Sequence, residues 1–156
     1  MTLNSKEFVM NALNKASLKA VGKQLATDLQ ERSSDMTGTE LYNEEEYIPT
    51  FAEAIAKKNM LDRKIGFICK ARDGIIVRLL QNYDSTVYTA DPTELPSLFG
   101  FVWSTDPSKA KPFIALSTSP YNKGECCSEN GSVYRSKIDN NVWKPSEYSQ
   151  GWKVVK

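Results

Sequence analysis

The sequence predicts an α+β protein with an N-terminal helical arm, a small α+β middle region containing a β-hairpin, and a small antiparallel β module at the C-terminus. Apolar residues recur at helical spacing from Ser5 to about Arg32. Two strand pairs are marked by the turn dipeptides Asp73-Gly74 and Asn130-Gly131. We therefore divide the chain into an arm (1–36), a middle domain (37–102) and a C-terminal module (103–156).

The predicted N-terminal helix has apolar residues every three or four positions, and charged residues cover much of its remaining surface. A polar linker follows at residues 33–39. The helix either packs on its own domain or docks on another subunit. In the second case its apolar side chains form an assembly interface, for which the candidates are Phe8, Leu13, Val21, Leu25 and Leu29.

The middle region is expected to contain two short helical segments. Thr50 followed by Glu53 predicts a capped helix near residues 48–56, because the Thr hydroxyl and the Glu carboxylate can each accept from a free backbone N–H. Asp91-Pro92 combines an N-cap with proline at the first helical position, which predicts a single helical turn.

Between these segments, strands 66–72 and 75–80 flank the two-residue turn Asp73-Gly74. The resulting register puts Phe67, Cys69, Ala71, Ile76 and Leu80 on one face, and Ile68, Ile75, Val77 and Leu79 on the other. Both faces are apolar. The hairpin is therefore covered on both sides, either within the chain or by a neighbouring subunit.

The C-terminal hairpin has Asn130-Gly131 at the two positions that need positive φ in a type I′ turn. With this turn the register is fixed, so that Cys127 faces Tyr134 and Cys126 faces Arg135. The face carrying Cys127 and Tyr134 is the expected core side, because the basic side chains on the opposite face can then reach water.

The C-terminal segment also contains a recognisable order of turn and aromatic residues. They are Tyr121, Gly124, Cys126-Cys127, Asn130-Gly131, Val133-Tyr134, Trp143, Pro145 and Trp152. This order resembles the small chitin- and cellulose-binding modules at the ends of bacterial glycosidases. The stretch 133–152 is closer still to the variants that phage and prophage proteins carry, and the resemblance covers roughly residues 119–153. Where the enzyme-borne modules have an acidic and a β-branched residue, this chain has Glu125-Cys126-Cys127.

The resemblance and the helical arm together imply a virion protein, most simply of a phage tail or baseplate. Such a protein is synthesised in the cytoplasm of the host bacterium, is oligomeric in the particle and has other virion or tail subunits as partners. Its C-terminal module would contact host cell-wall polysaccharide during adsorption, because flat aromatic faces stack on sugar rings. The candidate carbohydrate-binding residues are Trp143, Tyr148, Tyr121, Asn141 and Trp152. The alternative is a purely structural assembly protein or a capsid decoration protein without glycan binding.

Composition argues against several other classes. The 20 basic and 19 acidic residues give a formal net charge of +1, which provides no overall field for nucleic acid or an anionic membrane. There is no histidine, the commonest general base and transition-metal ligand. We therefore expect no catalytic residue, metal or cofactor, and no nucleic-acid partner.

Hydropathy, the N-terminal residues and the cysteine count predict a protein without membrane insertion, signal peptide or disulfides. No apolar run is long enough to insert in a membrane, and the first residues lack the pattern of a signal peptide. The three cysteines are an odd number, which predicts reduced thiols instead of a disulfide framework.

Overall fold

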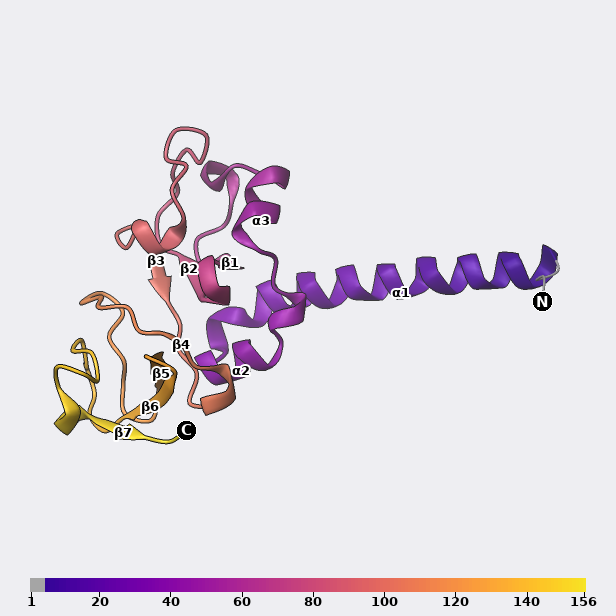
Figure 1. Ribbon diagram of the computed structural model, residues 1–156. Coiled ribbons are helices and arrows are strands. Elements are labelled where there is room, and N and C mark those ends of the chain that lie inside the picture. Colours follow the sequence, from indigo (N-terminus) through magenta and orange to yellow (C-terminus); the bar gives the residue numbers. More distant parts are fainter. Residues whose placement is uncertain (1–4) are drawn as a thin grey trace.

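The computed structural model describes residues 5–156, with side chains from residue 14 onward. Helix α1 (Ser5–Arg32) projects as a long rod from a folded body, and only its C-terminal end lies against that body (Figure 1). The body contains short helices and two small sheets. The predicted α+β class with an N-terminal helical arm is therefore confirmed.

The segment after α1 contains more structure than the predicted polar linker. A 3-10 turn, η1 (Ser33–Asp35), leads to a short helix, α2 (Gly38–Asn43), and then to η2 (Glu45–Tyr47). A complete capping box begins α2: the Thr37 hydroxyl accepts from Glu40 N, and the Glu40 carboxylate accepts from Thr37 N. The Thr37–Glu40 pair can be recognised in the sequence, but the apolar segment that follows it is too short to show helical periodicity.

Helix α3 (Phe51–Lys57) and the turn η5 (Pro92–Glu94) lie where the sequence predicted them. Thr50 caps α3 by accepting from Glu53 N, and Asp91 caps η5 by accepting from Thr93 N. A further turn, η3 (Met60–Asp62), follows α3. The first sheet is antiparallel in the order β1 (Ile68–Lys70), β2 (Ile76–Leu79), β3 (Phe99–Phe101), and β3 was not predicted as a strand.

The turn between β1 and β2 contains three residues, η4 (Arg72–Gly74), where the sequence predicted two. Asp73 and Gly74 do have the positive φ values that the turn signal indicated. Arg72 joins the turn because its backbone N–H donates to the carboxylate of Asp91, at 3.1 Å. Asp91 lies too far along the chain for a local turn rule to include it.

This extra turn residue shifts the β1–β2 register by one position, so the predicted division of faces is wrong. One side of the sheet carries Cys69, Ala71, Ile75, Val77 and Leu79, and the other carries Ile68 and Ile76. All seven side chains are buried by other parts of the chain. The hairpin is therefore covered on both sides without a neighbouring subunit.

The second sheet has the order β4 (Lys111–Pro112), β5 (Cys126–Glu129), β6 (Ser132–Ser136), β7 (Trp152–Val154). The β5–β6 register is the predicted one, and Asn130 and Gly131 both have positive φ. The β4 strand adds a short parallel pairing to the otherwise antiparallel module. Two turns, η6 (Pro107–Lys109) and η7 (Ser149–Gly151), precede β4 and β7.

Two apolar clusters lie on opposite sides of the first sheet. The smaller cluster joins Leu29 of α1 to Leu41, Tyr42, Ile48, Ile68 and Ile76. The larger one contains middle-region residues such as Phe51 and Phe99 together with Tyr121, Cys127 and Trp152 of the C-terminal segment. The predicted middle domain and C-terminal module therefore share one core.

Over the part of the chain that the structure describes, no helix combines the length and the apolar character needed to cross a bilayer.

Candidate functional site

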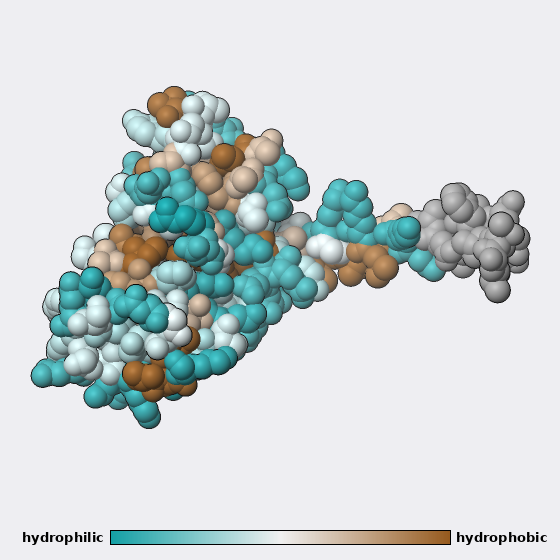
Figure 2. Space-filling model, in the orientation of Figure 1, coloured by the Kyte–Doolittle hydropathy of each residue, from teal (hydrophilic) through white to brown (hydrophobic). Residues whose placement is uncertain are grey.

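The projecting part of α1 exposes an apolar stripe, formed by Leu18, Val21 and Leu25 (Figure 2). These residues are spaced to share one side of a helix, and they are 72%, 55% and 39% exposed. Leu29 continues the stripe toward the body but is only 1% exposed, because it packs in the smaller core cluster. Leu29 is therefore a core residue, which corrects its assignment to an assembly interface. The side chains of Phe8 and Leu13 lie outside the described residues.

The base of α1 is held to the body by two side chains. The Gln30 amide donates to Ile68 O (2.8 Å) and accepts from Ile68 N (3.0 Å). The Arg78 guanidinium donates to Ser33 O (2.7 Å) and Met36 O (2.9 Å), just beyond the C-terminal end of α1. A cation there also interacts favourably with the helix dipole. These contacts fix the base of the arm against the first sheet.

Three of the five predicted carbohydrate-binding residues are structural. Tyr121 is fully buried, with its ring stacked between Trp103 (4.4 Å between centroids) and Phe113 (5.4 Å). Trp152 approaches Tyr121 edge-on and is also buried. Because burial removes the phenol from water, the pKa of Tyr121 lies well above its usual value. Neither ring is accessible to a sugar.

Asn141 is also buried, and its amide organises the loop around it. Its Nδ2 donates to Ser136 Oγ (3.0 Å) and Gly151 O (3.2 Å), while its Oδ1 accepts from Trp143 N (3.3 Å). Its hydrogen-bonding capacity serves the loop instead of a ligand. Sequence spacing could not distinguish this asparagine from a surface one.

The remaining two candidates, Trp143 and Tyr148, form a surface aromatic pair. Trp143 is 50% exposed, and its ring meets that of Tyr148 edge to face, with centroids 5.3 Å apart. With Glu147 they line an open hollow of about 300 Å³. The backbone is held because Trp143 O accepts from the Trp152 indole at 2.7 Å. The core tryptophan thus positions the exposed one.

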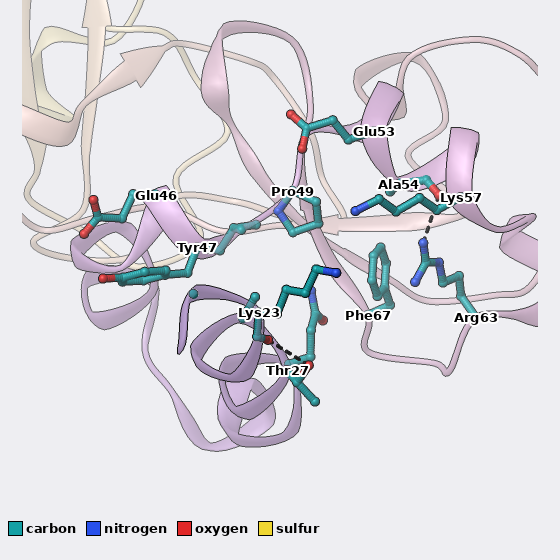
Figure 3. A pocket seen from close by; sticks show the side chains of 14 residues that line it. Lys23, Thr27, Glu46, Tyr47, Pro49, Glu53, Ala54, Lys57, Arg63 and Phe67 are labelled. Atoms are coloured by element: carbon teal, nitrogen blue, oxygen red, sulfur yellow. Dashed lines mark hydrogen bonds between the residues drawn. The ribbon is translucent and has the colours of Figure 1, made fainter. Parts of the chain in front are cut away.

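A larger groove of about 560 Å³ lies between the base of α1, the η2 segment and α3, and the sequence did not predict it (Figure 3). It brings together Lys23 of α1, Lys57 of α3 and Arg63 of the following loop. Pro49 and Phe67 supply apolar lining. These residues come from separate segments, so no local sequence pattern could have indicated the site.

The cysteines are not placed for nucleophilic chemistry. Cys69, Cys126 and Cys127 are buried and unpaired. Burial raises the pKa of Cys69 to about 12 and also raises the pKa values of the other two thiols. Because the thiolate is the reactive form, burial and the raised pKa values disfavour reaction of these thiols at neutral pH. Among residues 14–156, no group of three or more Cys, Asp or Glu side chains is arranged to hold a metal ion.

Comparisons with protein-family models, with curated proteins and with solved structures find no match for this chain. Its function is therefore inferred from its own residues and geometry.

Proposed function

We propose that this protein is a non-enzymatic structural component of a bacteriophage or phage-tail-like particle, most simply of the tail or baseplate. The observation that carries the proposal is the projecting α1 helix with its exposed apolar stripe of Leu18, Val21 and Leu25. We infer that this stripe docks the protein on another subunit. The resemblance of residues 133–152 to phage-borne modules supports the particle as the setting.

The energetics of the arm favour such a partner. A helix of 28 residues extends about 42 Å at 1.5 Å per residue. Helices in proteins owe most of their stability to the packing of an apolar face, which the exposed part of α1 lacks. Full burial of a Leu or Val side chain is worth about 1.5–3 kcal/mol. A partner surface over the stripe would supply this stabilisation.

Incorporation into particles tests the docking role. The variant Leu18→Asp with Val21→Asp places two charges on the stripe, whereas the control Ala16→Asp with Ala20→Asp places the same charges elsewhere on the exposed helix. We expect the first variant to be depleted at least about tenfold from particles purified after lysis, a loss of about 1.4 kcal/mol or more. The control should be incorporated normally. Equal incorporation of both would exclude docking through the stripe.

A second role, contact with host cell-wall polysaccharide, is favoured by the Trp143–Tyr148 pair. An exposed aromatic face beside the carboxylate of Glu147 is the arrangement that binds pyranose rings, through stacking and hydrogen bonds to hydroxyls. Tyr121, Asn141 and Trp152 then act as support for this surface. If the pair binds no glycan, the protein is a purely structural or capsid decoration component.

Binding of the full chain to host cell walls and to defined polysaccharides distinguishes these roles. We expect saturable binding that Trp143→Ala abolishes. Tyr88→Ala is the matched control, because Tyr88 is a similarly exposed aromatic residue outside the Trp143 hollow. Absence of binding by the folded protein, or equal loss in the control, would leave assembly as its role.

A further inference from the structure

Three cations meet in the groove at the base of α1. Figure 3 shows the side chains of Lys23 and Lys57 directed into the same space in front of Pro49. Arg63 enters from the side, and its Nη2 donates to Ala54 O at 2.9 Å. The carboxylate ends of Glu46 and Glu53 point away from this space (Figure 3). The centre of the groove is therefore cationic although acidic residues stand at its rim.

Among the side chains that the structure describes, no carboxylate lies within 4.0 Å of these three cations. Among residues 14–156, the ion pairs within 4.0 Å involve Arg32, Arg72, Lys109, Lys111 and Lys144. Lys23, Lys57 and Arg63 take part in none of them. Their charge is thus available to an anionic ligand.

Arg63 is also shaped for a ligand that is partly apolar. Its Cζ lies 4.2 Å from the centroid of the Phe67 ring, so guanidinium and ring form a flat stacked surface at the groove. Its Nε is enclosed and has no hydrogen-bond partner within the described part of the chain. An apolar side chain could pack beside Pro49 and Phe67 while its neighbouring carboxylates reach the lysines.

The positive charge continues from the groove along the arm. Lys15, Lys19 and Lys23 are four residues apart, so they form one row on α1, and all three are exposed. No acidic residue lies between Asn14 and Thr27. The row runs toward the groove, because Lys23 belongs to both.

We propose that the groove and the lysine row bind an acidic segment of another protein. Its carboxylates would pair with Lys15, Lys19, Lys23 and Lys57, and one apolar side chain would enter the groove. This site is distinct from the apolar stripe, and the inference does not depend on the proposed particle role.

Charge and shape select this occupant over two others. A nucleic-acid strand carries a negative phosphate at every residue but has no aliphatic side chain to pack beside Pro49 and Phe67. A second copy of the arm would bring the same row of lysines against this one, and like charges repel. An acidic peptide with interspersed apolar residues meets both the cations and the apolar lining.

The test uses the full chain and a fluorescein-labelled peptide of repeated Glu-Glu-Leu, about fifteen residues long so that it can span the row and the groove. Fluorescence anisotropy should show saturable binding that weakens as salt is raised. A Glu-Glu-Ser peptide of equal length should bind less tightly, because it lacks the apolar side chain.

Charge reversal locates the site. Lys23→Glu with Lys57→Glu should weaken binding of the Glu-Glu-Leu peptide at least about tenfold. Lys137→Glu with Lys153→Glu changes the net charge equally at exposed positions of the C-terminal segment, and should leave binding within about twofold. Circular dichroism checks that both variants remain folded.

Three results would overturn the proposal. They are absence of saturable peptide binding, equal weakening in the two charge-reversal variants, and tighter binding of oligo(dT) than of the peptide with the same dependence on Lys23 and Lys57. The last result would assign the groove to nucleic acid.

Discussion

The two ends of α1 have similar apolar spacing but different environments. Near the body, Leu29 is buried and Gln30 bonds to the backbone of Ile68 in the first sheet. Arg78 of the same sheet donates to Ser33 O, just beyond the end of the helix. Farther out, Leu18 and Val21 lie in solvent. Apolar periodicity thus predicts a helix with a face to bury, but it does not tell whether the covering surface belongs to the same chain. The difference separates the part of α1 that stabilises the fold from the part whose apolar side chains remain exposed.

The largest expected change in stability comes from comparing the same Leu→Ala substitution in the two parts of α1. Leu29→Ala should lower the free energy of unfolding by about 2–5 kcal/mol, because it leaves a cavity in the smaller core cluster. Leu18→Ala should change it by less than about 0.5 kcal/mol, because Leu18 has little packing to lose. Chemical denaturation of both variants measures the contrast. Similar losses would show that the outer part of α1 also packs within the chain.

An intermediate loss of stability is expected from removing Arg78, which holds the base of the arm. Arg78→Leu removes two charge-assisted hydrogen bonds to Ser33 O and Met36 O, and should cost about 1–3 kcal/mol. Hydrogen exchange of the last turn of α1 should accelerate as well. Arg72→Leu is the control, since its exposed pair with Asp73 is worth less than about 1 kcal/mol. Unchanged exchange in Arg78→Leu would mean that Leu29 and Gln30 suffice to hold the helix.

A smaller effect is expected from Gly22→Ala. A Cβ at this position meets no atom within 4 Å, so the substitution acts on helix propensity alone, by about 1 kcal/mol. Because the outer part of α1 has little packing on the body, we expect greater helical ellipticity and slower exchange there. The denaturation midpoint of the body should hardly move. A matching rise in that midpoint would show that arm and body unfold as one unit.

The smallest effect concerns a titrating group of the body. Burial raises the pKa of Glu125, so the folded state binds its proton more tightly than the unfolded state. Ionised Glu125 therefore costs stability above its folded pKa, and this cost disappears as pH falls through that value. Glu125→Gln should stabilise the protein at about pH 7, and the gain should shrink toward about pH 4. A constant difference between variant and parent across this range would contradict the assignment.

The two hairpins show what local sequence can predict. Asn130-Gly131 specified a tight turn with no competing contact, and the β5–β6 register followed. Asp73-Gly74 carried a similar signal, but Asp91 binds the backbone N–H of Arg72 and enlarges the turn. The second register depended on a contact between distant segments, which turn chemistry alone could not include.

The candidate sites show the same limit. Trp143 and Trp152 both matched the carbohydrate-binding pattern, yet one is exposed and the other supports it from the core. The cations of the groove come from α1, α3 and the loop after it, so only the fold brings them together. Sequence predicted which residue types could bind a ligand, whereas packing decided which of them can reach one.

The core shared across residue 103 also has a mechanical consequence. A load applied at Trp143 would pass through the Trp152 indole to the aromatic stack of Tyr121 and Trp103, and from there to the first sheet. Arg78 of that sheet carries the load to the end of α1. If the protein is held by its arm and pulled at its opposite end, the force is thus transmitted through packed side chains and hydrogen bonds, without a flexible linker between the described elements on this path.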